Sequence, residues 1–117
     1  MQDYRKLLVW QKSHRLTLDL YAVAASFHAP IAWPLQTQLL RAAISIPSNI
    51  AEGAGRGTDP DFRRFLLHSL GSVNEVEYDL LLARDLGFLP ERTYARLSGS
   101  VGEVRRMLSG LIASLKV

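Results

Sequence analysis

The chain has 117 residues, no cysteine and a formal net charge of +3 at neutral pH. This length suits one compact domain with one hydrophobic core, and we predict a single domain over residues 1–117. The absence of cysteine excludes disulfides, thiolate zinc sites, iron–sulfur clusters and cysteine nucleophiles. No apolar run reaches the roughly 18 residues needed to span a bilayer, and the N-terminal segment lacks the apolar core of a signal peptide. We therefore expect a soluble, cytoplasmic protein with no membrane partner.

Hydrophobic residues recur at helical spacing in four segments, whereas strand-like alternation is not sustained. In the two C-terminal segments these residues are separated alternately by three and four positions. The first of these series is Phe62, Leu66, Ser69, Val73, Val76, Leu80 and Ala83. The second series is Tyr94, Leu97, Val101, Val104, Leu108, Leu111 and Leu115. Two long helices with such matched seams are expected to pack at about 20 degrees.

Two further series predict helices earlier in the chain. They are Val9, Leu16, Leu20, Val23 and Phe27, and then Leu35, Leu39, Ala42, Ile46 and Asn49. Pro34, Pro60 and Pro90 each suit a first helical turn, and Gly87 suits a left-handed helix end. We predict helices over about residues 8–28, 34–55, 59–86 and 90–115. Because the connections are short, the sequence predicts an all-α, antiparallel up-down-up-down four-helix bundle.

Apolar residues also lie outside the predicted seams. They are Leu18, Tyr21, Ala25, Leu40, Ile44, Leu67, Leu70 and Leu81. A bundle helix needs only one apolar stripe, and large exposed apolar patches are uncommon on monomers. This second face favours self-association or a protein partner, and a wide core stripe is the alternative.

The segment Gly53-Ala-Gly-Arg-Gly57 is similar to fragments of phosphate-binding loops. However, a dinucleotide fingerprint follows a strand, and a P-loop continues with Gly-Lys-Ser or Gly-Lys-Thr. Here a predicted helix precedes the glycines, and Gly57 is followed by Thr58 and Asp59. We therefore predict that Gly53, Gly55 and Gly57 end the second helix and supply positive-φ backbone for the turn.

No residue pattern indicates catalysis, a metal or a cofactor. A di-iron bundle needs Glu-x-x-His pairs, which the acidic residues do not form. The histidines lie on different elements without a partner one turn away, and the serines lack a recognisable base. These residues are His14, His28 and His68, and Ser45, Ser48 and Ser69. The only acidic pair worth inspecting for an enzyme is Glu52 with Glu75.

Pro47 interrupts the second predicted helix and leaves the carbonyl of Ala43 without its usual donor. Ser48 or Asn49 is near enough in sequence to help organise the bend. Asn49 and Glu52 continue the face of Ile46, so we predict a buried polar cluster that sets the helix register. Its available partners are Arg41, Arg56, Arg84 and the Ala43 carbonyl.

Eleven of the fourteen basic residues are arginine, which suits phosphate or carboxylate recognition. The predicted nucleic-acid contacts are Arg56, Arg63, Arg64, Arg92 and Arg96. With Arg105 and Arg106 they would form a basic surface across the third and fourth helices, and an ordinary solvated face is the alternative. Asp59 and Asp61 already occupy the start of the third helix. No aromatic residue is expected among the arginines, so base stacking is not indicated.

A resemblance to a known family rests on four parts of the sequence. They are Leu8–His14, Gln38–Gly53 with Gly55–Arg56, Phe62–Leu66, and Gly71–Ser72 with Glu75 and Glu77. The chain resembles the four-helix-bundle family named for proteins encoded in intervening sequences of 23S ribosomal RNA genes, over about residues 7–89. Its most specific element is the S-I-P-S-N-I-A-E-G motif. With two matched residues outside that motif, Arg56 and Glu75, the resemblance defines a structural cluster of motif residues: Pro47, Asn49, Glu52, Gly53, Arg56 and Glu75.

The resemblance implies a bundle that often assembles as a homopentamer around a central channel. It also implies a relation to the accessory variability determinant of diversity-generating retroelements, a basic pentamer that binds nucleic acid and a reverse transcriptase. The net charge of +3 is low for a strong nucleic-acid binder. The family has no established enzymatic activity.

We therefore expect a non-enzymatic, homo-oligomeric bundle that associates with RNA or DNA or acts as a scaffold. A reverse transcriptase or another protein is a further expected partner. The alternative is an adaptor that docks a helix of a partner protein without nucleic acid.

Overall fold

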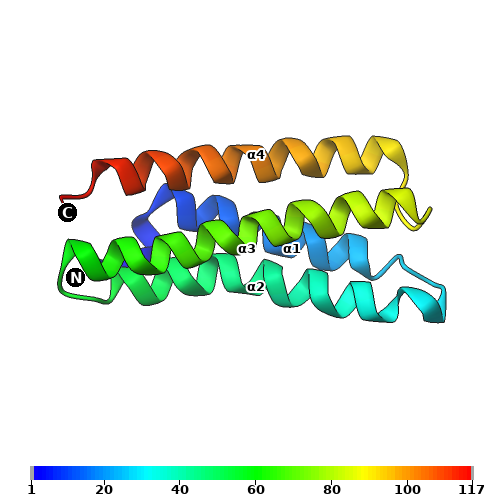
Figure 1. Ribbon diagram of the computed structural model, residues 1–117, viewed down its shortest axis with the longest axis horizontal. Coiled ribbons are helices and arrows are strands. Elements are labelled where there is room, and N and C mark those ends of the chain that lie inside the picture. Colours follow the sequence, from blue (N-terminus) through cyan, green and yellow to red (C-terminus); the bar gives the residue numbers. More distant parts are fainter. Residues whose placement is uncertain (1, 117) are drawn as a thin grey trace.

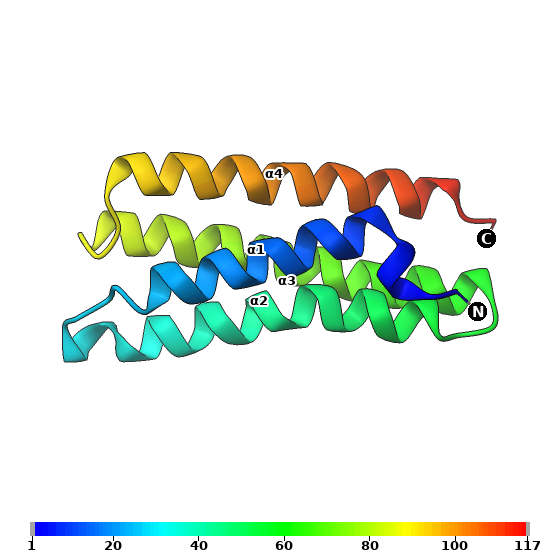
Figure 2. The same cartoon turned by 180° about the vertical axis from the view of Figure 1, so that it is seen from behind.

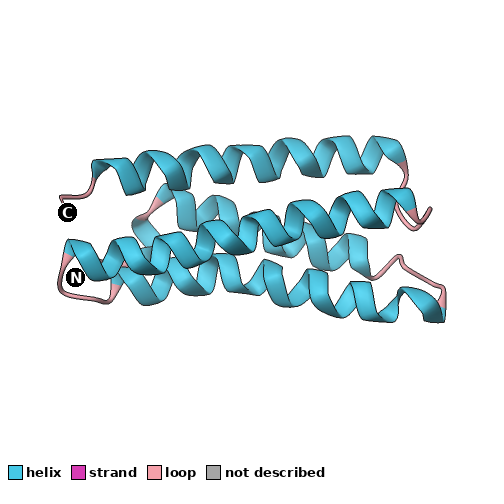
Figure 3. Cartoon of the chain, viewed as in Figure 1, coloured by secondary structure: helices cyan, strands magenta, loops and turns pink. Residues whose placement is uncertain are grey.

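The computed structural model describes residues 2–116, and every regular element within that range is helical (Figure 3). The long helices are α1 (Leu8–Ala24), α2 (Trp33–Ala54), α3 (Asp59–Asp85) and α4 (Glu91–Ser114). Short 3-10 helices η1 (Tyr4–Lys6) and η2 (Pro30–Ala32) precede α1 and α2. Consecutive helices run in opposite directions along the long axis of a rod-shaped molecule of 45 × 21 × 20 Å (Figure 1). The prediction of an all-α up-down bundle is confirmed.

The helices follow one another around the bundle. α1 packs against α2 and α4, and α3 packs against the same two helices. α1 and α3 are therefore diagonal to each other, with α1 behind α3 in Figure 1 and in front of it in Figure 2. Consequently the outer surface of α1 and the α2–α3 surface face different sides of the molecule.

The core follows the predicted seams most closely in α3, where all seven seam residues are buried. In α4 the central residues Leu97, Val101, Val104 and Leu108 are buried, whereas Tyr94, Leu111 and Leu115 are partly exposed. These three residues lie near the ends of the rod, where fewer neighbours cover them.

Pro47 is buried inside α2, and side chains of α1 and α3 donate hydrogen bonds to backbone carbonyls near it. The hydroxyl of Thr17 in α1 lies 3.1 Å from the freed Ala43 carbonyl oxygen and 2.8 Å from that of Ser13, so its proton is shared between them. On the other side, Ser69 in α3 donates to the Ile46 carbonyl at 2.9 Å. The prediction that Ser48 or Asn49 organises this bend is wrong, because the donor comes from α1.

Gly53 lies within α2 and permits a close approach to α3. A Cβ atom at this position would lie 2.8 Å from Phe65 Cβ and 2.9 Å from Phe62 Cδ1. The helix does end at the next residue, Ala54. Among the described residues only Gly87 has a positive φ, of 81°, so the prediction of positive φ at Gly53, Gly55 and Gly57 is wrong.

Gly87 ends α3 as its sequence predicts. The backbone N–H groups of Gly87 and Phe88 bond to the carbonyls of Arg84 and Ala83, which closes the helix end. Phe88 then packs against Phe27, with ring centroids 5.9 Å apart.

α1 is shorter than predicted, because it ends at Ala24 instead of near residue 28. The N–H groups of Ser26 and Phe27 form tight turns back to Val23 and Ala24. The side chain of Gln36 in α2 donates to the Ala24 carbonyl at 2.7 Å and so completes this end. The other helix boundaries lie within one residue of the predicted positions.

Thr17→Val should destabilise the fold by about 1–3 kcal/mol, because it leaves the carbonyl of the buried Ala43 without a donor. Urea denaturation followed by circular dichroism would measure this loss. Thr37→Val is the matched control, since the partly exposed Thr37 hydroxyl makes no hydrogen bond within residues 2–116. A loss for Thr17→Val no larger than for Thr37→Val would contradict the assigned role.

Candidate functional site

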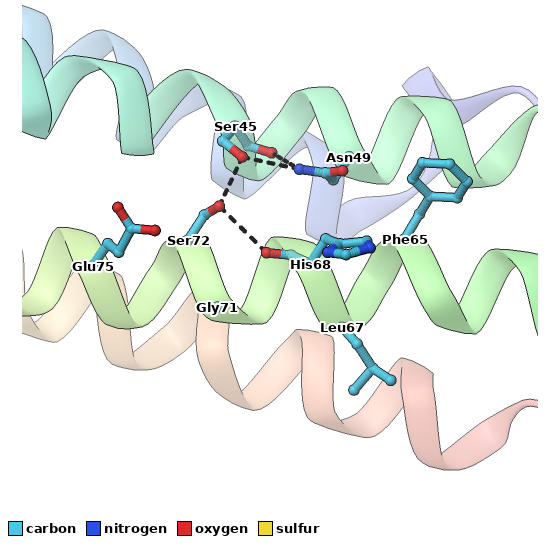
Figure 4. Close-up of a pocket in the computed structure, with 8 residues that line it drawn as sticks. All are labelled: Ser45, Asn49, Phe65, Leu67, His68, Gly71, Ser72 and Glu75. Atoms are coloured by element: carbon cyan, nitrogen blue, oxygen red, sulfur yellow. Dashed lines mark hydrogen bonds between the residues drawn. The ribbon is translucent and has the colours of Figure 1, made fainter.

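A polar groove of about 540 Å³ lies between α2 and α3 (Figure 4). α2 contributes Ser45 and Asn49, and α3 contributes Phe65, His68, Ser72 and Glu75 among the lining residues. The groove therefore follows the face on which Gly53 brings the two helices together.

Hydrogen bonds connect the two walls of this groove. The Asn49 amide nitrogen donates to the carbonyl and hydroxyl oxygens of Ser45, at 2.8 and 2.9 Å. The Ser72 hydroxyl lies 2.7 Å from the Ser45 hydroxyl and 3.3 Å from the His68 carbonyl oxygen (Figure 4). Asn49 thus donates only within α2, and the Ser45–Ser72 contact links the helices.

Two arginines lie against one aromatic ring at the end of this groove. The guanidinium carbons of Arg56 and Arg64 lie 4.8 and 4.5 Å from the centre of the Phe65 ring. The His68 ring meets the Phe65 ring at 6.2 Å in an edge-on arrangement. The prediction that no aromatic lies among the arginines is wrong for this group, which we name the Arg56–Phe65–Arg64 cluster.

Both arginines of the cluster also form ion pairs at the surface. Arg56 bonds to Glu52 at 2.9 Å, and Arg64 bonds to Asp61 at 3.4 Å. All four side chains are substantially exposed. Because exposed ion pairs contribute only about 0–1 kcal/mol, an anionic ligand can replace these carboxylates at low cost.

The predicted buried polar cluster does not form. Glu52 is exposed and pairs within its own helix, and Asn49 is half-buried at the groove wall. The inward face of α2 continues from Ile46 to Ile50 and Gly53, as a period of 3.6 residues requires.

Arg84 is also far from the predicted cluster. It lies at the other end of α3, pairs with Asp85 and Glu91, and packs over the Tyr94 ring at 4.5 Å. The antiparallel course of α2 and α3 places the end of one helix beside the start of the other.

The predicted basic residues are divided between the two ends of the rod. Arg63 and Arg64 begin α3, whereas Arg92 and Arg96 begin α4, which runs in the opposite direction. Along α3, residues 64 and 84 are about 30 Å apart at 1.5 Å per residue. Arg105 is held between them by Glu77 and Asn74, at 3.1 and 3.0 Å. The structure therefore brings Arg56 and Arg64 together and leaves Arg92 and Arg96 at a distance.

Asp79 is a largely buried acidic residue that the sequence prediction missed. It is 9% exposed and has no ion pair or side-chain hydrogen bond within the described range. Burial raises its pKa to about 6, and the charge of Glu75, one turn away, adds to this effect. The available signal was its position, three residues after Val76 and one before Leu80, inside the apolar stripe.

Asp79→Asn should stabilise a single chain by about 1–3 kcal/mol near pH 7.5 and have little effect at pH 4. The folded chain binds the Asp79 proton more tightly than the unfolded chain, whose pKa is near 3.8. The contribution of Asp79 to the stability of the native protein therefore falls as pH rises from about 4 to about 7, and the variant lacks this contribution. Urea denaturation at several pH values, at protein concentrations low enough to keep the chains monomeric, would measure the free energy of unfolding. The same pH dependence in the native protein and the variant would contradict the prediction.

Residues 2–116 offer neither a metal site nor a membrane span. These residues contain no group of three or more His, Asp or Glu side chains suited to a metal ion. None of their helices is both long and apolar enough to cross a membrane.

The fold and its motif-bearing α2–α3 face define an all-α four-helix-bundle protein. The chain belongs to the family of 23S rRNA-intervening sequence proteins, whose family model matches residues 5–110. A solved structure from Bacteroides thetaiotaomicron, a protein of unknown function from the S23 ribosomal protein family, has the same fold. It aligns with a TM-score of 0.82 and 23% identity, over 90% of this chain and 98% of that one. No curated protein matches the sequence.

The motif residues have three different structural positions. Pro47 and Gly53 are buried where α2 meets its neighbours. Asn49 and Glu75 line the groove, and Glu52 with Arg56 forms the ion pair beside the Phe65 ring. The most specific part of the sequence therefore surrounds the groove.

Proposed function

We propose that this protein is a non-enzymatic, homo-oligomeric bundle that associates with single-stranded RNA or DNA through the Arg56–Phe65–Arg64 cluster. The observation that supports this function is the placement of two arginines around one partly exposed aromatic ring. Single-strand binding combines cations along the backbone with aromatic rings that stack on bases, and every base offers a face for stacking.

The groove beside the cluster adds polar groups for an unstacked base. The Asn49 amide donates to Ser45, so its oxygen remains available within the described residues to accept a hydrogen bond. The His68 ring extends the aromatic surface of Phe65 along α3. A strand that lies along α3 would therefore meet cations first and aromatic and polar groups next.

Exposed apolar residues support the homo-oligomeric part of the proposal. Leu18, Tyr21, Ile44 and Leu67, from the predicted second apolar face, are 41–52% exposed. Larger fractions of Ile31, Trp33, Leu86 and Tyr78 are exposed. So many exposed large apolar side chains are unusual on a monomeric surface.

Two finer expectations stay predictions. They are the pentameric state and the relation to the accessory variability determinant, with its reverse transcriptase partner. Both rest on the sequence resemblance.

Phe65→Ala should weaken binding of fluorescently labelled single-stranded RNA and DNA by about 1–3 kcal/mol, because a base would stack on the ring face that a guanidinium leaves when it turns to a phosphate. Arg56→Ala and Arg64→Ala should each reduce the slope of log K against log salt by about 0.7 for every lost phosphate contact. Fluorescence anisotropy across a salt series would measure both effects.

The Arg92→Ala/Arg96→Ala double variant is the comparison, since it removes two cations from the other end of the rod. It should bind like the native protein. Absence of any binding at low salt would refute the nucleic-acid function, and an equal loss for the comparison variant would refute the assigned site.

Light scattering coupled to size-exclusion chromatography should give a mass of several chains at micromolar protein concentration. The exposed apolar side chains would then be covered by neighbouring copies. A mass of one chain would contradict the homo-oligomeric part of the proposal and leave the nucleic-acid test unaffected.

A further inference from the structure

A second, apolar groove lies at the opposite end of the α2–α3 face from the Arg56–Phe65–Arg64 cluster. Its volume is about 400 Å³, and its walls include Ile31, Leu35, Leu82, Leu86 and Phe88. Ile31 is 79% exposed and Leu86 is 54% exposed. The groove therefore presents apolar surface to water without any element of the described chain covering it.

Asp79 lies in this groove. The residue as a whole is 9% exposed, and its carboxylate, whose oxygens still reach the water of the groove, has no ion-pair or side-chain hydrogen-bond partner within residues 2–116. A surface that covers the groove would remove this water, and burying a carboxylate is costly unless a cation or hydrogen-bond donors compensate its charge. The surface that covers this groove should therefore be apolar and should carry a cation opposite Asp79.

The outer face of α1 has this composition. Leu18 and Tyr21 are 52% and 46% exposed there, and Arg15 lies one turn before Leu18. Arg15 is exposed and forms no ion pair within the described part of the chain. Leu18 is a one-turn neighbour of both Arg15 and Tyr21, so the three side chains form a continuous strip that winds over about a third of the helix circumference.

This face cannot reach the groove of its own chain. α1 lies diagonally across the bundle from α3, which supplies Asp79 (Figure 2). A contact between the two surfaces must therefore join different copies, and it is head-to-tail because the surfaces differ. Such contacts form a closed ring when the rotation between copies closes.

We propose that the Asp79 groove of one copy receives the outer face of α1 of a second copy, with Arg15 of that copy paired to Asp79. This inference rests on the proposed self-association and assigns the surfaces that produce it. It also explains why a carboxylate that destabilises the single chain occupies an apolar groove.

Arg15→Glu should raise the dissociation constant for self-association by more than about tenfold, because it places a second carboxylate beside Asp79. Sedimentation velocity of the full chain across micromolar concentrations would measure this. Arg106→Glu is the matched control, since Arg106 is exposed on α4 and also lacks an ion pair within residues 2–116. The double variant Arg15→Glu with Asp79→Lys should recover much of the lost association.

Asp79→Asn separates the proposed role from a purely structural one. It should stabilise the single chain and yet weaken association, whereas a structural role would shift both quantities in the same direction. Circular dichroism of each variant would confirm that it is folded.

A native protein that stays monomeric would refute this inference together with the proposed self-association, and the groove would then suit a cationic helix of another protein. An oligomer unaffected by both Arg15→Glu and Asp79→Asn would refute this inference alone. An oligomer sensitive only to Asp79→Asn would show that the occupant is not α1 of a second copy.

Discussion

The close contact between α2 and α3 is the constraint on which the rest of the structure depends. Gly53 permits it, because a Cβ atom at that position would collide with Phe62 and Phe65. Ser69 then reaches the Ile46 carbonyl, one residue before the proline that interrupts the donor pattern of α2. Because the interior is close-packed, these small residues set the distance between the two helices and with it the width of the surface they share.

That shared surface carries different chemistry at its two ends. Near the C-terminal end of α2, arginines, an aromatic ring and a hydrogen-bonded polar wall face solvent together. Near its N-terminal end, mostly apolar side chains surround Asp79, a largely buried residue. The antiparallel order of the helices keeps the two regions apart, so a ligand at one end leaves the other free for a protein contact.

Local sequence patterns predicted much of the fold, whereas they did not predict which side chains meet at the candidate site. The alternating spacing from Phe62 to Ala83 placed seven residues in the core, and Gly87 marked the end of α3. By contrast, the partner of the Ala43 carbonyl lies 26 positions away, at Thr17, and no local pattern identifies it. Asn49 and Glu52 were wrongly placed on the inward face because the prediction advanced three residues after Ile46. The helix advances four residues there, so its inward face continues at Ile50.

The sequence alone determined the helical class, the antiparallel order, most helix boundaries and the presence of surplus apolar residues. These properties depend on periodicity, on the backbone limits of proline and on short connections, all of which are local. Only the tertiary structure decided that Arg56 and Arg64 meet around Phe65, that Arg92 and Arg96 lie elsewhere, and that Asp79 is buried without a partner. Those facts depend on how far each helix is rotated and shifted against its neighbours, which is set by the packing of side chains distant in sequence.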